Sequence, residues 1–337
     1  MRVVALIPGG VGEQILFFPT LDGLKQKYPD AEIDVVVEPR AKAAYRVSKS
    51  VNDVITFDFK DRSSPADWAN LLGVIRDRYY DAALSLRQNW GTGLLLWLTG
   101  VPTRIGSEDS AGKYFLTHTV PFNADQYTAQ SNYDLLQGMG VKAACPEVAI
   151  SVPKSDIDWA EAEQKRLGIR GSGYVLMYPG KSLLAEGETS YPLASWLTIV
   201  EDFQQKQPDM PLVIVKQTGD LDTVTTLTQA VPSLKVTKPA DMGKLAALVA
   251  GANLMIAPNS VPMHLAIALQ VYTLALFGSS SSSQVLPKSD KFIAIQSPTR
   301  SIADIQPAEI CKGLGRLRPW TSETFVLSQF WQFSWVL

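Results

Sequence analysis

One candidate for proton-transfer chemistry lies near the start of the chain, in the segment Pro8-Gly9-Gly10-Val11-Gly12-Glu13. The segment follows an apolar run and opens a stretch of helical length, so its glycines predict a tight turn that exposes backbone N–H groups to a ligand. Gly10 and Gly12 are the candidate turn residues. Glu13 would be a carboxylate in the first helical turn. It is either a general base or an acid that the helix dipole stabilises.

A second candidate site follows the apolar run Leu254–Ile256, in the segment Asn259-Ser260-Val261-Pro262-Met263-His264. Ser260 has the side chain of a helix N-cap, and proline suits the first turn. The backbone N–H groups of Ser260 and Val261 would then form an anion site. His264 lies one turn into this helix. It either belongs to the site or is a core histidine that caps a backbone carbonyl.

Hydroxyl side chains gather in a third segment, the serine run from Ser279 to Ser283. The run follows the apolar segment Thr273–Phe277 and would lie at the carboxyl edge of a sheet, where ligands bind in open α/β folds. Two interpretations stay open, a ligand-binding loop and a flexible turn.

Composition excludes several functional classes. Lys and Arg total 31 against 33 Asp and Glu, which gives a formal charge of -2 and no basic field for nucleic acid. With 2 cysteines and 2 histidines the chain has too few ligands for a disulfide framework or a Cys/His zinc site. We therefore expect no metal and no nucleic-acid partner. The first residues do not form a signal peptide, and no apolar run is long enough to span a bilayer, so we expect a cytoplasmic protein.

NAD binding is disfavoured by the glycine spacing. The motif G-G-x-G is not the dinucleotide fingerprint G-x-G-x-x-G, and no acidic residue clearly ends the second strand at the expected place.

The elements that would position these residues alternate between strand and helix. Apolar runs predict strands at 3–7, 33–37, 54–57 and 82–86, and again at 174–177, 212–215, 254–256, 273–277 and 292–295. Segments of helical length, such as 12–28 and 66–78, lie between them. This rhythm predicts two α/β halves with parallel sheets, which agrees with about two domains for 337 residues. We place the first domain at 1–150 and the second at 151–315.

The chain resembles the family 9 glycosyltransferases, the bacterial ADP-heptose:lipopolysaccharide heptosyltransferases and their relatives. Glu13 with its glycine turn, Tyr28–Val35, Tyr80–Leu86 and Gly100–Gly106 are similar to the family's first domain. Three stretches match the second domain in order and spacing: Met177-Tyr178-Pro179-Gly180, Asn259 to Ala266, and Leu276-Phe277-Gly278.

The resemblance implies the GT-B architecture, two Rossmann-like domains facing across a cleft, and an inverting glycosyltransferase. The second domain would bind a nucleotide-sugar (ADP-sugar-like) donor, and the first a glycan or glycolipid acceptor, which would place the protein at the inner face of a membrane. No cofactor or metal is implied. Glu13 would be the catalytic base, with Gly10, Gly12 and Arg104 on the acceptor side. The donor-binding residues implied are Gly180, Thr189, Asp220, Asn259, Ser260, Val261, His264, Ser279, Ser280 and Ser281; Asp220 is equally well interpreted as a turn aspartate.

Three positions depart from the family pattern. Glu13 stands where relatives have Asp, Asn259 where they have Asp, and Thr189 where they have a donor-binding Lys. Lys181 or Lys216 could replace that cation. Two hypotheses follow: an active glycosyltransferase, or a catalytically inactive relative that acts as a binding or assembly factor for a protein partner.

The last segment, 316–337, is rich in aromatic residues, including Trp320, Trp331 and Trp335. It is either a closing helix that packs back on the first domain or an exposed anchor, at 320–337, for a protein partner or a membrane surface.

Overall fold

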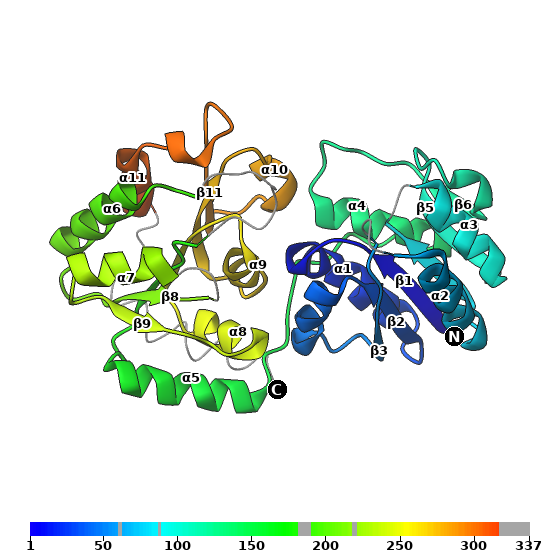
Figure 1. Cartoon of the computed structure of the whole chain (residues 1–337), viewed down its shortest axis with the longest axis horizontal. Coiled ribbons are helices and arrows are strands. Elements are labelled where there is room, and N and C mark those ends of the chain that lie inside the picture. The colour runs from blue at the N-terminus through cyan, green and yellow to red at the C-terminus, as the bar shows by residue number, and fades with distance from the viewer. Residues whose placement is uncertain (60–62, 87–88, 181–189, 218–220, 317–337) are drawn as a thin grey trace. The chain divides into compact units, whose positions relative to one another are not determined.

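The computed structural model describes residues 1–59, 63–86, 89–180, 190–217 and 221–316, which form two α/β units that divide between Ile150 and Ser151 (Figure 1). The predicted aromatic tail from residue 317 on lies outside the described residues.

The first unit alternates strands and helices in chain order. Its elements are β1 (Arg2–Ile7), α1 (Val11–Lys27), β2 (Glu32–Val37), η1 (Pro39–Val47), β3 (Asp53–Thr56), α2 (Pro65–Asp77), β4 (Ala82–Ser85), α3 (Trp90–Thr99), β5 (Thr103–Ser107), η2 (Lys113–Phe115), β6 (His118–Val120), α4 (Thr128–Asp134) and η3 (Leu135–Met139).

The second unit repeats this alternation. Its elements are α5 (Lys154–Leu167), β7 (Val175–Met177), α6 (Leu193–Lys206), β8 (Leu212–Val215), α7 (Leu221–Ala230), β9 (Lys235–Thr237), α8 (Met242–Ala250), β10 (Leu254–Pro258), α9 (Val261–Ala268), β11 (Tyr272–Phe277), α10 (Ser282–Val285), β12 (Phe292–Gln296), η4 (Ile302–Asp304) and α11 (Pro307–Arg316).

The two sheets have the same topology. The first has the order β3-β2-β1-β4-β5-β6 and the second the order β9-β8-β7-β10-β11-β12, and every strand pair in both is parallel. This is the Rossmann order, and the direction of winding reverses between β1 and β4 in one unit and between β7 and β10 in the other. Ligands of such sheets bind at this switch point, beyond the carboxyl ends of the strands.

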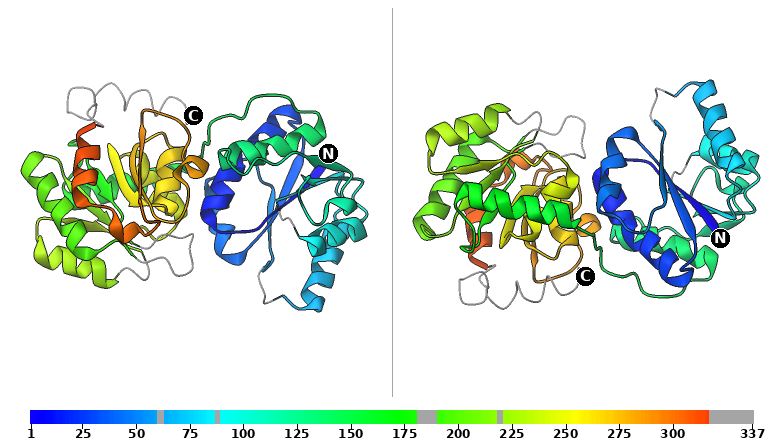
Figure 2. Two further views of the ribbon diagram at one scale, coloured as in Figure 1. Left: turned by 90° about the horizontal axis from the view of Figure 1, so that it is seen from above. Right: turned by 90° about the horizontal axis from the view of Figure 1, so that it is seen from below.

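Helices cover both faces of each sheet (Figures 1 and 2). In the first unit, α2 and α3 bury Leu71, Ile75, Leu95 and Leu96 against the strands, while α1 packs with α4 on the other face. In the second unit, α6, α7 and α11 bury one apolar cluster around Trp196, and α8 contacts both α5 and α9 on the other face. Burial on both faces explains why the central strands read as continuous apolar runs.

The predicted α/β fold with parallel sheets is confirmed, but three short strands are absent from the prediction. These are β5, β6 and β9, with the sequences TRIGS, HTV and KVT. Each contains polar residues and lacks the apolar run from which the other strands were predicted. Two of them, β6 and β9, lie at the outer edge of their sheets, where burial on both faces is not required.

Candidate functional site

The glycine turn after β1 is shaped around Glu13. Gly9 has φ +109°, and a Cβ there would lie 2.9 Å from Glu13 Cγ, so both the backbone and the space require glycine. The N-cap residue Gly10 donates its N–H to Glu13 Oε2 at 2.9 Å. The carboxylate therefore lies at the N-terminal end of α1, where the helix dipole stabilises an acid. Glu13 is half-buried beside the turn.

A second carboxylate, that of Glu38, contacts the same turn. The prediction that no acidic residue ends the second strand is therefore wrong. Glu38 directly follows β2 and is 6% exposed, although no acidic residue was expected at the end of the second strand. Gly9 donates its N–H to Glu38 Oε1 at 3.3 Å, and Arg40 pairs with Oε2 at 3.0 Å. Both oxygens are engaged within the protein, so Glu38 does not offer the free carboxylate that a dinucleotide ribose requires.

A buried polar chain fixes the start of α1. The Tyr45 hydroxyl donates to Gln14 Oε1 at 2.6 Å, and Gln14 Nε2 donates to the Ile7 carbonyl at 3.0 Å. Gln14 is fully buried, and burial raises the pKa of Tyr45 well above its usual value, so the phenol stays a neutral donor. These bonds join η1, α1 and β1, and they hold the turn in one geometry.

The structure brings Gly10, Gly12 and Glu13 together but places Arg104 elsewhere. Arg104 lies on β5 opposite Ala83, which in turn pairs with Val4 of β1. Its guanidinium donates to the backbone carbonyls of Phe115, at 2.8 Å, and Val101. Arg104 therefore braces the β5–η2 segment rather than the glycine turn.

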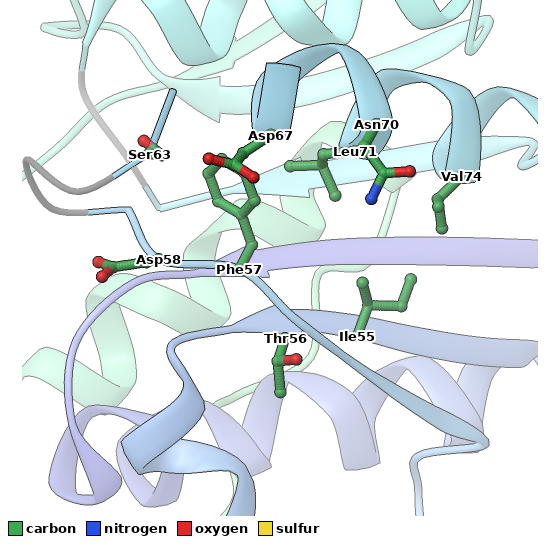
Figure 3. Close-up of a pocket in the computed structure, with 9 residues that line it drawn as sticks. All are labelled: Ile55, Thr56, Phe57, Asp58, Ser63, Asp67, Asn70, Leu71 and Val74. Carbon is green, nitrogen blue, oxygen red and sulfur yellow. The ribbon is translucent and has the colours of Figure 1, made fainter. Parts of the chain in front are cut away.

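A pocket of about 270 Å³ lies between β3 and α2, beyond the carboxyl end of β3 (Figure 3). Polar side chains at its mouth include Asp58, Asp67 and Asn70. Asp67 accepts hydrogen bonds from the backbone N–H and the hydroxyl of Ser64 at 2.7 and 2.8 Å, and these bonds lower the pKa of its carboxyl. Its carboxylate therefore caps α2. None of the predicted site residues lines this pocket.

In the second unit, the turn between β10 and α9 is almost completely buried. Asn259, Ser260, Val261 and His264 are 2%, 1%, 7% and 3% exposed. Ser260 is the N-cap of α9, as predicted, but its side chain caps no backbone N–H. Among the described residues, Ser260 Oγ has no hydrogen-bond partner. A buried hydroxyl without a partner is costly unless a water or a ligand satisfies it.

The first turn of α9 offers backbone donors without a cation. The backbone N–H groups of a first helical turn have no partner within the helix. Pro262 has no N–H group, so the donors of this turn are the N–H groups of Val261 and Met263. Burial lowers the pKa of His264 to about 4, so its imidazole is neutral at pH 7. An anion at this turn would be held by N–H and O–H dipoles.

Two of the other predicted donor segments follow the strands on either side of β10. Gly180 follows β7, which pairs with β10, and the Tyr178 N–H donates to the Ile256 carbonyl at 2.9 Å. Ser279, Ser280 and Ser281 follow β11, the other neighbour of β10.

The serine loop is braced by a residue that the sequence did not indicate. Gln296, the last residue of β12, donates to the Gly278 carbonyl at 2.9 Å and accepts the Ser282 N–H at 3.1 Å. A glutamine at the end of an apolar run carries no distinctive signal, which is why sequence reasoning missed it.

Three of the positions named from the sequence, Lys181, Thr189 and Asp220, lie outside the described residues. Lys216 follows β8, and its backbone N–H donates to the Thr237 carbonyl. Within the described ranges, no group of three or more His, Cys, Asp and Glu side chains could hold a metal ion. None of the described helices is both long and apolar enough to cross a membrane.

Comparison with known proteins identifies the relatives of this chain. The model of glycosyltransferase family 9 (heptosyltransferase) matches residues 68–312. Lipopolysaccharide heptosyltransferase 3 of Escherichia coli is 23% identical over 333 residues, which cover 91% of this chain and 96% of the relative. The Photosynthetic NDH subunit of subcomplex B 1 from Arabidopsis thaliana chloroplasts is 22% identical over 331 residues, which cover 90% and 71%.

The fold has a counterpart among solved structures. That of the E. coli ADP-heptose lipopolysaccharide heptosyltransferase II superposes with a TM-score of 0.73 at 17% identity, over 94% of this chain and 98% of the other.

Proposed function

Because the chain belongs to glycosyltransferase family 9, we propose that it transfers a sugar from a nucleotide-sugar donor to a hydroxyl group of a glycan or glycolipid, with inversion at the anomeric carbon. An ADP-sugar is the donor class that the relatives favour, since one of them is named for ADP-heptose. Another is named for lipopolysaccharide, which favours a lipid-linked glycan as acceptor.

The observation that supports the donor assignment is the buried hydroxyl of Ser260 at the N-terminus of α9, which has no hydrogen-bond partner among the residues that the structure describes. The donor diphosphate would accept a hydrogen bond from Ser260 Oγ and from the first-turn N–H groups. Ser279, Ser280 and Ser281 would contact it from the neighbouring loop. Because His264 is neutral, these dipoles would stabilise the diphosphate as it leaves, with no metal required.

Glu13 is the proposed general base of the acceptor side. One of its oxygens, Oε2, already accepts the Gly10 N–H, which leaves Oε1 to accept a proton. In the proposed step the acceptor oxygen attacks the anomeric carbon of the donor and passes its proton to Glu13. The bond between that carbon and the phosphate oxygen breaks, and its electron pair leaves with the nucleoside diphosphate.

The experiment is calorimetric titration of the full chain with ADP-, GDP- and UDP-sugars. We expect saturable binding of one class, and an affinity about tenfold lower in Ser260→Ala, because one hydrogen bond to a charged group is lost. The matched control is Ser289→Ala, since Ser289 is an exposed serine of the same unit. Equal affinity in Ser260→Ala and wild type would refute the assignment of the diphosphate site.

The alternative hypothesis, an inactive glycosyltransferase-like protein that binds a partner through residues 320–337, is not favoured by the family match. One relative is nevertheless named as a subunit of a larger complex. Absence of any nucleotide-sugar binding, together with a copurifying protein that is lost when residues 320–337 are deleted, would replace the enzyme proposal with this alternative.

A further inference from the structure

An apolar surface lies exposed on the first unit, at helix α3. Trp90, Trp97 and Leu98 of α3 are 59%, 53% and 46% exposed, and Tyr114 of η2 is 86% exposed. We call these four residues the α3 aromatic surface. The sequence of α3, WGTGLLLWLT, contains no charged residue. An exposed apolar face of this kind marks an interaction site more often than an accident of packing.

Packing gives this surface a defined shape. The opposite face of α3 buries Leu95 and Leu96 in the core. A Cβ at Gly93 would lie 2.7 Å from the Gly112 carbonyl oxygen, so α3 contacts the turn before η2 through bare backbone. This close approach places the Phe115 ring 6.0 Å from Trp90 and 6.3 Å from Trp97, centroid to centroid. The exposed rings are therefore carried on a packed scaffold.

We propose that the α3 aromatic surface binds the interfacial layer of a lipid bilayer, and so brings the first unit to a lipid-linked acceptor. This inference rests on the proposed function. Trp and Tyr are the side chains that prefer the interface between headgroups and acyl chains, because each has an apolar body and a polar group. Lys113, whose ammonium lies 5.7 Å from the Tyr114 ring centroid, could extend to the headgroups from beside them.

The exposed area favours a bilayer over a second copy of the chain. A buried aromatic side chain contributes roughly 150–250 Å², so the exposed fractions of the four side chains amount to on the order of 500 Å². A standard protein interface buries roughly 800 Å² on each partner. The surface is therefore small for a stable dimer, whereas a bilayer requires no complementary partner shape.

The charges beside the surface indicate which lipids it would bind. The segment between β5 and η2 carries exposed Glu108 and Asp109 as well as the nearby Lys113. Over the described residues 108–115, these two acids outnumber the one lysine, so this stretch gives no net positive charge to attract anionic lipid. Apolar contact would dominate, and binding to zwitterionic bilayers would be about as strong as binding to anionic ones.

The topology connects this surface with the proposed acceptor site. Helix α3 follows β4, the neighbour of β1 at the switch point, and the Leu86 N–H donates to the Leu6 carbonyl at that edge. Trp90, the first residue of α3, therefore follows the same edge of the sheet as the glycine turn. A bilayer on α3 would present the sugar of a lipid-linked acceptor near Glu13.

The test is cosedimentation of the full chain with phosphatidylcholine vesicles, and with vesicles that also contain phosphatidylglycerol. We expect both to bind the wild type, and the double variant Trp90→Ser/Trp97→Ser to bind at least about tenfold more weakly. Trp159→Ser is the matched control, since Trp159 is a half-buried tryptophan of α5 in the other unit. Circular dichroism and thermal melting confirm that each variant folds.

Three outcomes would overturn the inference: wild-type protein that stays in the supernatant, a double variant that sediments like the wild type, and binding that needs anionic lipid. A dimer in light scattering that the double variant loses would replace the bilayer with a second copy. Calorimetry with nucleotide-sugars on the same preparations separates the two proposals. Donor binding without vesicle binding rejects the membrane surface alone, and vesicle binding without donor binding rejects the proposed function.

Discussion

The turn between β1 and α1 and the turn between β10 and α9 border the switch points of two sheets with the same strand order, yet their chemistry is opposite. The first is occupied by the protein's own anions, since Glu13 and Glu38 accept the Gly10 and Gly9 N–H groups. The second turn, residues 259–264, contains no acidic residue, and within the described part of the chain the hydroxyl of Ser260 has no hydrogen-bond partner.

The comparison shows that a helix N-terminus does not by itself provide a binding site for a substrate anion. The dipole of either helix favours a negative charge by a similar amount, about 0.3–2 kcal/mol. In α1 that favourable position is already taken by a carboxylate, so a phosphate would meet repulsion there. In α9 the position remains available. Under the proposed function, the side chains of the two turns, and not their backbones, would therefore place the base in one unit and the diphosphate in the other.

The largest expected effect comes from removing the proposed base, Glu13. In Glu13→Gln the amide oxygen can still accept the Gly10 N–H, but the group no longer takes a proton. We expect the initial rate of sugar transfer to fall by about 10²–10⁴-fold with donor affinity unchanged. Asp30→Asn, an exposed acid of the same unit, is the control. An unchanged rate in Glu13→Gln would remove Glu13 from the chemistry.

The next prediction concerns the neutral state of His264, which should make the free energy of unfolding depend on pH. The pKa of His264 is about 4 in the folded protein, below the ordinary value near 6.5. Above pH 6.5 the group is neutral in both states and costs nothing. As the pH falls from 6.5 to 4, the unfolded chain takes up the proton first, and about 3 kcal/mol of stability is lost.

Urea unfolding at a series of pH values, for wild type and His264→Gln, measures this loss. We expect the wild type to lose more stability than the variant between pH 6.5 and 4. Parallel pH profiles for the two proteins would show that His264 is charged or solvated in the folded state.

A smaller effect is expected when a carboxylate is introduced into the turn between β10 and α9, as the turn between β1 and α1 already has. In Ser260→Asp the N-cap stays favourable for α9, so thermal stability should hold. The new carboxylate would repel the donor diphosphate as well as remove the hydroxyl, and we expect about a hundredfold loss of affinity in calorimetry, against about tenfold in Ser260→Ala. If Ser260→Asp binds the donor as well as Ser260→Ala does, charge is not what distinguishes the two turns.

The smallest effect is expected from the buried hydrogen bonds of Tyr45 and Gln14, which hold the turn between β1 and α1. Tyr45→Phe removes the hydroxyl that donates to Gln14. We expect a loss of about 1 kcal/mol in the free energy of unfolding, measured by urea titration, because one buried hydrogen bond is lost. The transfer rate should fall less than in Glu13→Gln. Stability equal to that of the wild type would mean that the polar chain does not hold the turn.

Much of the fold could be predicted from the sequence because the central strands are buried on both faces and so appear as apolar runs. The glycine turn and the Ser260 N-cap were also predictable, since each depends on neighbours close in the chain. Glu38 was missed although β2 ends at Val37 as predicted, because its role depends on the Gly9 N–H, which lies 29 residues away in the chain. Arg104 was placed on the acceptor side by resemblance, whereas its guanidinium is held by backbone carbonyls from a loop that only the folded chain brings near.

The contact between Gly9 and Glu13 also has a consequence for variation at this turn. A methyl group at residue 9 would collide with the Glu13 side chain and demand a backbone conformation that other residues avoid. Gly9→Ala would therefore displace the carboxylate, and its damage to transfer would not add to that of Glu13→Gln. If Glu13 is the base, substitutions at residues 9 and 13 would impair the same step, and neither residue could change in evolution independently of the other.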